Sequence, residues 1–359
     1  MESHQDAAPS VGEAGHPACS AGAEEDHVDL WLGNLEGAFE NFGEEEEEGE
    51  DEQAGRGFKK KPWAQRVERI DYASITQDEF RERFLETNMP AILGNWDKIP
   101  ALDVDYWLQK HPNMMVPLDV GTPQERVVRL GDFLSDLGSD QEGEEGQRAL
   151  RTRYLRSIHT AEWFEKENAA IVYPEVFGKN HLADETREYP HSWRRWYELF
   201  ISVRECSGFP FVHKDMCATH ALSLQVQGIK RFFLFPPSDS PHLYAHGHTQ
   251  SRSAIPHSDL VNDTVDPAAF PLYSHATMHI ADIRAGDVFF CPSNWWHTTC
   301  VVSAEPSVTL GGNFVTDENL EEHASQWRDY LNMQAMASAG AAHIEHVAKR
   351  PLKKAETKG

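Results

Sequence analysis

The segment HALSLQVQGIKRFFLFP, residues 220–236, decides the fold class because it predicts two strands separated by a tight turn. Both halves are short and rich in apolar, β-branched or aromatic residues, a composition that favours strands. Gln227 and Gly228 lie between the halves and form a turn signal. We therefore expect a strand hairpin near the centre of the domain.

Similar strand patterns occur on both sides of this hairpin, in a region of the chain that spans residues 197–316. Turn signals separate several of them, as at 284–287 and 292–294. Such an array predicts an antiparallel sandwich or barrel. The four further segments are YELFISVREC (197–206), HATMHIADI (275–283), GDVFFCP (286–292) and PSVTLGGNFV (306–315).

Helical patterns flank the predicted strands, so we expect a mainly β fold with flanking helices. The segment SITQDEFRERFLETN (74–88) begins with a Ser/Thr start signal and repeats its apolar residues at helical spacing. It is followed by MPAILGNW (89–96), which predicts a short buried strand. Further helices are expected within 103–112, 126–137 and 317–348.

The net charge of −25 is unevenly distributed along the chain. Residues 1–55 contain 17 Asp and Glu and no Lys or Arg, which leaves 41 acidic and 33 basic residues in the remainder. Repulsion among the carboxylates predicts a disordered acidic tail over 1–60, which is a candidate binding segment for a partner. A basic tail over 349–359 ends the chain. The weak acidity of the body disfavours a nucleic-acid partner without excluding it, and favours a basic peptide.

The cysteines and the apolar runs bear on the compartment. None of the five cysteines forms a C-x-x-C pair, which argues against a zinc knuckle, and their odd number and low density argue against a secreted disulfide scaffold. The first residues, MESHQDAAPS, lack the basic and apolar stretches of a signal peptide. No run approaches the ~20 apolar residues that span a bilayer. We expect a cytoplasmic or nuclear protein with no membrane partner.

A His-x-Asp or His-x-Glu pair occurs five times, but only His213 and Asp215 lead directly into the predicted hairpin. Residues two apart on a strand point to the same side, so both side chains are candidate ligands of one metal ion. His297, in AGDVFFCPSNWWHTT (285–299), is a candidate third ligand from a distant strand. Two imidazoles and one carboxylate suit a non-haem iron centre. The structural alternatives are a surface histidine beside an acid and a core histidine among aromatic residues.

Lys230 and Asn313 are candidates for binding an anionic co-substrate. Lys230 follows the predicted turn, where an inward-facing lysine needs an anionic partner because a buried unpaired charge is costly. Alternatively, Lys230 faces solvent beside Arg231. Asn313 lies on a later predicted strand, from which it can hydrogen-bond a carboxylate.

A second group of histidines lies between the strand groups, and we interpret it as a solvated or lid-like loop. No cysteine and no regular ligand spacing accompany these histidines, which argues against a second metal site. They are His242, His246, His248 and His257.

In their order along the chain, these motifs resemble the Jumonji-C oxygenases. The motifs are HKD (213–215), QVQGIKRFFLFPP (225–237), IRAGDVFFCPSNWWHTT (283–299) and GGNF (311–314). The stretch 74–96 resembles the helical lead-in of the cupin-like Jumonji-C proteins. The resemblance covers roughly 67–331 and implies a double-stranded β-helix, the jelly-roll or cupin fold, over about 197–316.

The resemblance also implies a set of site residues. Fe(II) would be bound by His213, Asp215 and His297, which would be both the catalytic residues and the metal ligands. Lys230 would bind the 5-carboxylate of the co-substrate 2-oxoglutarate. Asn313 would lie near its 1-carboxylate.

The activity that the resemblance implies is that of a 2-oxoglutarate-dependent dioxygenase, most readily a protein side-chain hydroxylase. An N-methyl lysine or arginine demethylase is the alternative, and RNA or a small molecule stays open as a substrate. A non-catalytic cupin-fold binding or scaffold protein is the alternative of a different class. Pro210 and Ser223 depart from the pattern of several relatives, which leaves the further contacts of 2-oxoglutarate open. The sequence does not indicate the oligomeric state.

Overall fold

The computed structural model describes residues 64–122, 124–137, 154–186, 189, 191–204, 211–247 and 250–333. The predicted acidic and basic tails, and the helical region beyond 333, lie outside the described residues. Among the described residues, no helix has both the length and the apolar character needed to cross a membrane.

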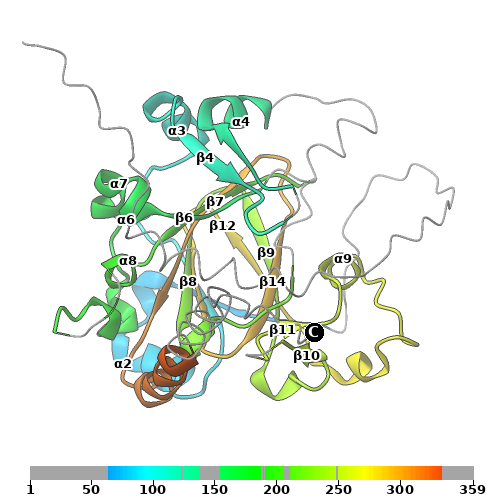
Figure 1. The fold of residues 1–359 in the computed structure, drawn as a ribbon. Helices are drawn as coiled ribbons and strands as arrows, with labels where there is room; N and C mark the ends of the chain where they lie inside the picture. Colours follow the sequence, from blue (N-terminus) through cyan, green and yellow to red (C-terminus); the bar gives the residue numbers. More distant parts are fainter. Residues whose placement is uncertain are drawn as a thin grey trace, which may run out of the picture. The chain divides into compact units, whose positions relative to one another are not determined.

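Two sheets form the centre of the described region (Figure 1). The larger has seven strands in the order β2-β3-β13-β8-β15-β7-β6, and the smaller has four in the order β1-β12-β9-β14. The strands of the larger sheet are β2 (Glu68–Asp71), β3 (Ala91–Gly94), β6 (Leu155–His159), β7 (Glu198–Ser202), β8 (His220–Gln227), β13 (Val288–Cys291) and β15 (Ser307–Phe314). Those of the smaller sheet are β1 (Gln65–Arg66), β9 (Ile229–Phe235), β12 (His279–Arg284) and β14 (Trp296–Val301). Two further pairs are β4 (Met115–Leu118) with β5 (Arg126–Arg129), and β10 (Ala245–His246) with β11 (Arg252–Ser253).

The two large sheets pack face to face, as the predicted sandwich requires. The rings of Phe232 on β9 and Phe289 on β13 have centroids 4.4 Å apart. Leu234 and Cys291 belong to the same buried cluster, so the contact continues along both strands. Burial of this apolar area removes it from water and stabilises the pair of sheets.

The predicted hairpin at 220–236 is wrong, although both of its strands exist. β8 pairs with β13 and β15, whereas β9 pairs with β12 and β14 in the other sheet. The turn at Gly228 therefore carries the chain from one sheet to the other. Its φ of +73° suits glycine, and a Cβ there would lie 2.5 Å from the Pro306 carbonyl oxygen.

Short helices cover the outer face of the seven-stranded sheet (Figure 1). The predicted helix in 74–88 is confirmed, since Thr76 and Glu79 form a reciprocal capping box at its start. Phe80 then packs on Phe290 of β13 with ring centroids 5.3 Å apart.

Most helices of the described region are short. They are α2 (Gln77–Phe80), the π-helical η4 (Arg81–Leu85), α3 (Val104–Lys110), α4 (Leu130–Asp136), α6 (Thr160–Trp163), α7 (Glu165–Ala170), α8 (His191–Arg194) and α9 (His257–Asn262), with a further helix over 320–333. The 3-10 turns are η3 (Tyr72–Ser74), η5 (Glu175–Phe177), η6 (His181–Ala183), η7 (Met216–Ala218), η8 (Pro237–Asp239) and η9 (Pro271–His275).

The outer face of the four-stranded sheet is also covered. Phe233 and Phe235 on β9 pack into a buried cluster with Leu260 of α9. Phe232 and Leu234 alternate with them and face the other sheet. Since β9 is buried on both sides, every position along it faces one of two enclosed environments, and Lys230 shares the inner one with Phe232 and Leu234.

Gly311 and Gly312 on β15 make room for two different groups, and this difference predicts unequal effects of substitution. A Cβ on Gly311 would meet the ring edge of Phe200 at 2.6 Å, whereas a Cβ on Gly312 would collide with the main-chain carbonyl of Trp196. A ring can move and a strand carbonyl cannot, so Gly312→Ala should lower the free energy of unfolding by about 1–3 kcal/mol and Gly311→Ala by less. Urea denaturation measures both losses, and equal losses would contradict this account.

Candidate metal centre

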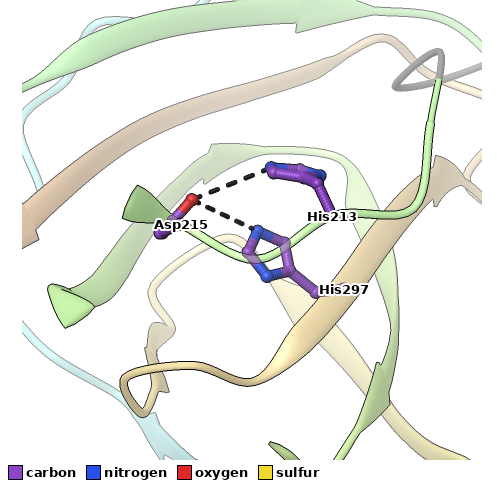
Figure 2. A group of neighbouring side chains, drawn as sticks. All are labelled: His213, Asp215 and His297. Carbon is purple, nitrogen blue, oxygen red and sulfur yellow. Dashed lines mark ion pairs between the residues drawn. The ribbon is translucent and has the colours of Figure 1, made fainter. Parts of the chain in front are cut away.

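The structure brings His213, Asp215 and His297 together between the two sheets (Figure 2). His213 and Asp215 lie just before β8, and His297 lies on β14. The Asp215 Oδ1 atom is 3.7 Å from Nε2 of His213 and 3.8 Å from Nε2 of His297. One ligand atom from each residue lies within 4.8 Å of the others.

Main-chain hydrogen bonds place the two histidines side by side. The N–H of His213 donates to the carbonyl of His297 over 3.0 Å, and the N–H of His297 donates back over 2.7 Å. Residues paired in this way in an antiparallel ladder project their side chains to the same face. The ring centroids of the two histidines are accordingly 4.3 Å apart.

The surroundings of both imidazoles suit metal binding. Nδ1 of His297 lies 3.2 Å from the Trp295 carbonyl oxygen, which can only accept a hydrogen bond, so this contact favours the tautomer with its proton on Nδ1 and its lone pair on Nε2. Burial, with the neighbouring His297 as the next cause, holds the pKa of His213 well below its usual value. A neutral imidazole is the form that coordinates metals.

Asn313 fixes the orientation of the carboxylate. Its side-chain nitrogen donates to Oδ2 of Asp215 at 2.9 Å and to the hydroxyl of Thr219 at 2.8 Å. With Oδ2 held in this way, Oδ1 is the oxygen that faces the two histidines. The contact that the structure gives Asn313 is therefore with a predicted ligand, and its place near the 1-carboxylate of 2-oxoglutarate stays a prediction.

This donor set fits a ferrous ion. Two neutral imidazole nitrogens and one carboxylate oxygen on one face leave further coordination positions open, as in non-haem Fe(II) centres. Among the described His, Cys, Asp and Glu residues, these three form the group that could hold a metal ion.

Lys230 faces inward on β9, so the solvent-facing alternative is wrong. Its ammonium lies 4.8 Å from the centroid of the Phe200 ring and donates to the Tyr154 hydroxyl over 3.4 Å. Lys230 is paired with Val301, four residues beyond His297 on β14. Lys230 therefore lies on the same face as His297, about 13 Å along the sheet at the usual rise per residue. Arg231 points to the opposite face and pairs with Asp282.

Sequence reasoning missed Tyr154, which lies immediately before β6 and beside Lys230. The available signal was the strand pattern of YLRSIH (154–159), to which no element was assigned. Ser223, one of the two departures, is buried on β8 and pairs with Gly311, so it shares the inner face with Asn313 two residues later. Pro210 lies outside the described residues.

The second group of histidines is partly structural, and the expectation of a loop is wrong for His257. His257 begins α9, is buried, and hydrogen-bonds through Nε2 to the Thr299 carbonyl at 3.1 Å. His242 lies 3.4 Å from an oxygen of Asp239. His248 lies outside the described residues, and the others do not form a described metal-binding group.

The buried His257 predicts a loss of stability in mild acid. Burial lowers its pKa to about 4, while an unfolded histidine takes up its proton near 6.5. Its contribution is therefore complete above pH ~6.5 and is lost as the pH falls toward 4, at up to about 1.4 kcal/mol per pH unit. Urea denaturation from pH 7 to 4.5 should show a shallower pH dependence for His257→Gln, which can still donate to the Thr299 carbonyl. Identical slopes would argue against a buried neutral His257.

Removing the Asn313 amide should weaken metal binding without removing a ligand. Asn313→Ala frees Asp215 to rotate, and loss of such an outer contact typically lowers metal affinity about 10–100-fold. Calorimetric titration of the purified protein with Fe(II) under nitrogen measures this. Asn262→Ala, an exposed change at the end of α9, is the matched control. An unchanged dissociation constant for Asn313→Ala would contradict the assigned role.

Comparison with known proteins places these features in a family. A family model described as Cupin-like domain matches residues 76–316. Jumonji C domain-containing protein 5 of Drosophila melanogaster is 24% identical over 68% of this chain and 58% of its own length. Lysine-specific demethylase JMJ21 of Arabidopsis thaliana is 22% identical over 68% of this chain and 25% of its own length. The human tRNA wybutosine-synthesizing protein 5 is 35% identical over 34% of this chain and 36% of its own length.

The match to the family model extends over most of the chain and includes every strand of the two sheets except β1 and β2, together with all three residues of the candidate centre. The chain spans 58% or less of the length of the relatives named here, so the likeness concerns their shared domain. The resemblance expected from the motifs and the predicted cupin-type core are confirmed. This chain therefore belongs to the cupin-like domain family, and its relatives include Jumonji C domain proteins.

Proposed function

We propose that this chain is a dioxygenase that depends on Fe(II) and 2-oxoglutarate, and that it hydroxylates a side chain of a protein substrate. The observation that carries the proposal is the convergence of His213, Asp215 and His297 on one face, with Lys230 inward on the same face. A bound Fe(II) and 2-oxoglutarate supply the oxidising chemistry that converts a C–H bond into an alcohol.

In this proposal, some residues bind the metal and others orient a ligand or bind the co-substrate. His213, His297 and Asp215 hold the metal, and Asn313 keeps the carboxylate turned toward it. Lys230, whose ammonium lies against aromatic rings, binds the distal carboxylate of 2-oxoglutarate.

Three neighbours of Lys230 explain why a carboxylate would bind well there. The Tyr154 hydroxyl accepts from the ammonium and can donate its own proton to a carboxylate oxygen. Phe200 and Phe232 lie against the ammonium and keep water away from it, which strengthens a charge pair. A lysine enclosed by rings has an energetic reason to attract an anion.

The demethylase alternative is favoured by one specific observation, the likeness to the lysine-specific demethylase of Arabidopsis. Hydroxylation of an N-methyl carbon ends in loss of that carbon, so the two activities share every residue above. Mass spectrometry of proteins incubated with the enzyme separates gain of one oxygen from loss of a methyl group. A binding or scaffold role is less favoured because the ligand group is complete and its carboxylate is oriented.

Turnover of 2-oxoglutarate tests the proposal without knowledge of the substrate. The wild-type protein should form succinate in the presence of Fe(II) and oxygen, and His297→Ala should abolish this because one of three ligands is lost. Lys230→Ala should raise the KM for 2-oxoglutarate about tenfold or more, the value of a hydrogen bond to a charged group. Exposed Lys179→Ala is the matched control. Succinate formation that persists unchanged in His297→Ala would refute the proposal.

A further inference from the structure

Arg252 lies on the face of the candidate centre. Its main chain forms an antiparallel bridge with His213, which is itself paired with His297 on the other side. The bridge is held by hydrogen bonds from Lys214 to the Ser251 carbonyl and from Ser253 to the Val212 carbonyl. In this pattern 213 and 252 form the closely spaced type of pair, so the side chain of Arg252 starts beside that of His213.

Phe211 holds the Arg252 side chain in place. The guanidinium carbon of Arg252 lies 3.9 Å from the centroid of the Phe211 ring, a cation–π contact. The same ring lies edge-on to His213 with centroids 5.4 Å apart. The guanidinium is thus stacked on one of its faces, while the N–H groups at its edge keep their capacity to donate in its plane.

Arg252 differs from two other arginines of the fold, Arg69 and Arg231, in its electrostatic partners. Arg69 pairs with Asp287 and Arg231 pairs with Asp282. Among the described residues, no carboxylate forms an ion pair with Arg252, which is only partly exposed. The charged neighbour that affects it is another cation, Arg156, and burial followed by Arg156 lowers the pKa of Arg252. A partly desolvated cation beside a second cation is a position that favours an anion.

A count of charges indicates where that anion comes from. Under the proposed function, the two charges of Fe(II) and that of Lys230 balance Asp215 and the two carboxylates of 2-oxoglutarate. Arg156 has Glu198 among the opposite charges that act on it. Among the groups that the structure describes, none balances the charge of Arg252 at the centre, so the substrate, which has still to bind, is expected to be negative.

We propose that Arg252, stacked on Phe211, receives a carboxylate of the substrate, and that the substrate is an acidic peptide. This inference rests on the proposed function and refines it. A planar guanidinium presents parallel N–H groups that match a carboxylate. A long polyanion such as RNA is less suited, because residues 56–359 carry 41 acidic and 33 basic side chains and repel it. The charges beside the centre thus outweigh the overall acidity from which a basic peptide was expected.

The test compares two pools of fluorescent peptides of equal length, one with Asp or Glu at a fixed central position and one with Lys or Arg there. Binding to the full-length protein is measured by anisotropy with Fe(II) and 2-oxoglutarate under nitrogen, so that no turnover occurs. The wild-type protein should bind the acidic pool about tenfold or more tightly than the basic pool. Arg252→Gln should remove this preference and Arg252→Glu should reverse it, while exposed Arg129→Gln should keep it.

Arg252→Lys is the control for loss of binding caused by misfolding. It keeps the positive charge and should therefore retain part of the preference for the acidic pool. Tighter binding of the basic pool by the wild-type protein would overturn the inference. So would an Arg252-dependent preference for single-stranded RNA, or an Arg252→Gln protein whose defect is confined to the KM for 2-oxoglutarate. Succinate formation without peptide is measured in parallel in air. Its absence in the wild-type protein would refute the proposed function, whereas an Arg252-dependent acidic preference would still support the anion subsite.

Discussion

The reciprocal main-chain hydrogen bonds between His213 and His297 are the contacts on which the candidate centre depends. They join the segment that leads into β8, in the seven-stranded sheet, to β14 in the four-stranded sheet. Because His213 and His297 belong to segments of different sheets, their side chains meet only if the two sheets keep their relative position. A slip of one residue in this pairing would turn the His297 side chain to the outer face, because side chains alternate along a strand.

Other contacts support the same junction from both sides. The Ser293 N–H donates to Nδ1 of His220 at 3.0 Å, which ties the turn before β14 to the first residue of β8. Burial lowers the pKa of His220 to about 3, so the imidazole stays neutral and keeps that acceptor. From β15, Asn313 reaches Asp215. The three ligands are thus positioned by contacts to β8, β14 and β15, and buried polar contacts fix the loops between these strands, as precise positioning of a site requires.

The sequence predicted strand positions well and strand partners poorly, and the hairpin at 220–236 shows why. The pattern of apolar residues in β8 and β9 indicates that both strands are buried. A strand is equally buried whether it hydrogen-bonds to the next strand in the sequence or to a distant one, so the pattern does not identify its partner. Among the strands at the sheet edges, β1, β2 and β6 carry weaker patterns and escaped prediction. His213, Asp215 and His297 were accessible because metal ligands are chemically rare types at a recognisable spacing. Tyr154 and Arg252 have no such signature, since their importance arises only from what lies beside them in three dimensions.

The charges of the protein show a similar limit of sequence analysis. Composition gives the net charge of the chain, whereas only the structure gives the charges that lie beside the candidate centre. The net charge of −25 comes largely from the first 55 residues, and the weaker net acidity of residues 56–359 led to the expectation of a basic partner. A ligand at the centre, however, experiences charges within about one Debye length, roughly 8–10 Å in physiological salt, and buried groups are screened least. Within that range, the acids of the surface contribute little to the binding of a charged ligand. Its binding depends instead on which nearby cations already have a carboxylate partner. Arg231 has its carboxylate in Asp282, and Lys230 has an assigned anion under the proposed function, but Arg252 is stacked on a ring that offers no compensating charge. An acidic protein can therefore select an acidic substrate, because under this proposal selectivity is set by Arg252, a cation beside the candidate centre for which the described residues supply no carboxylate partner.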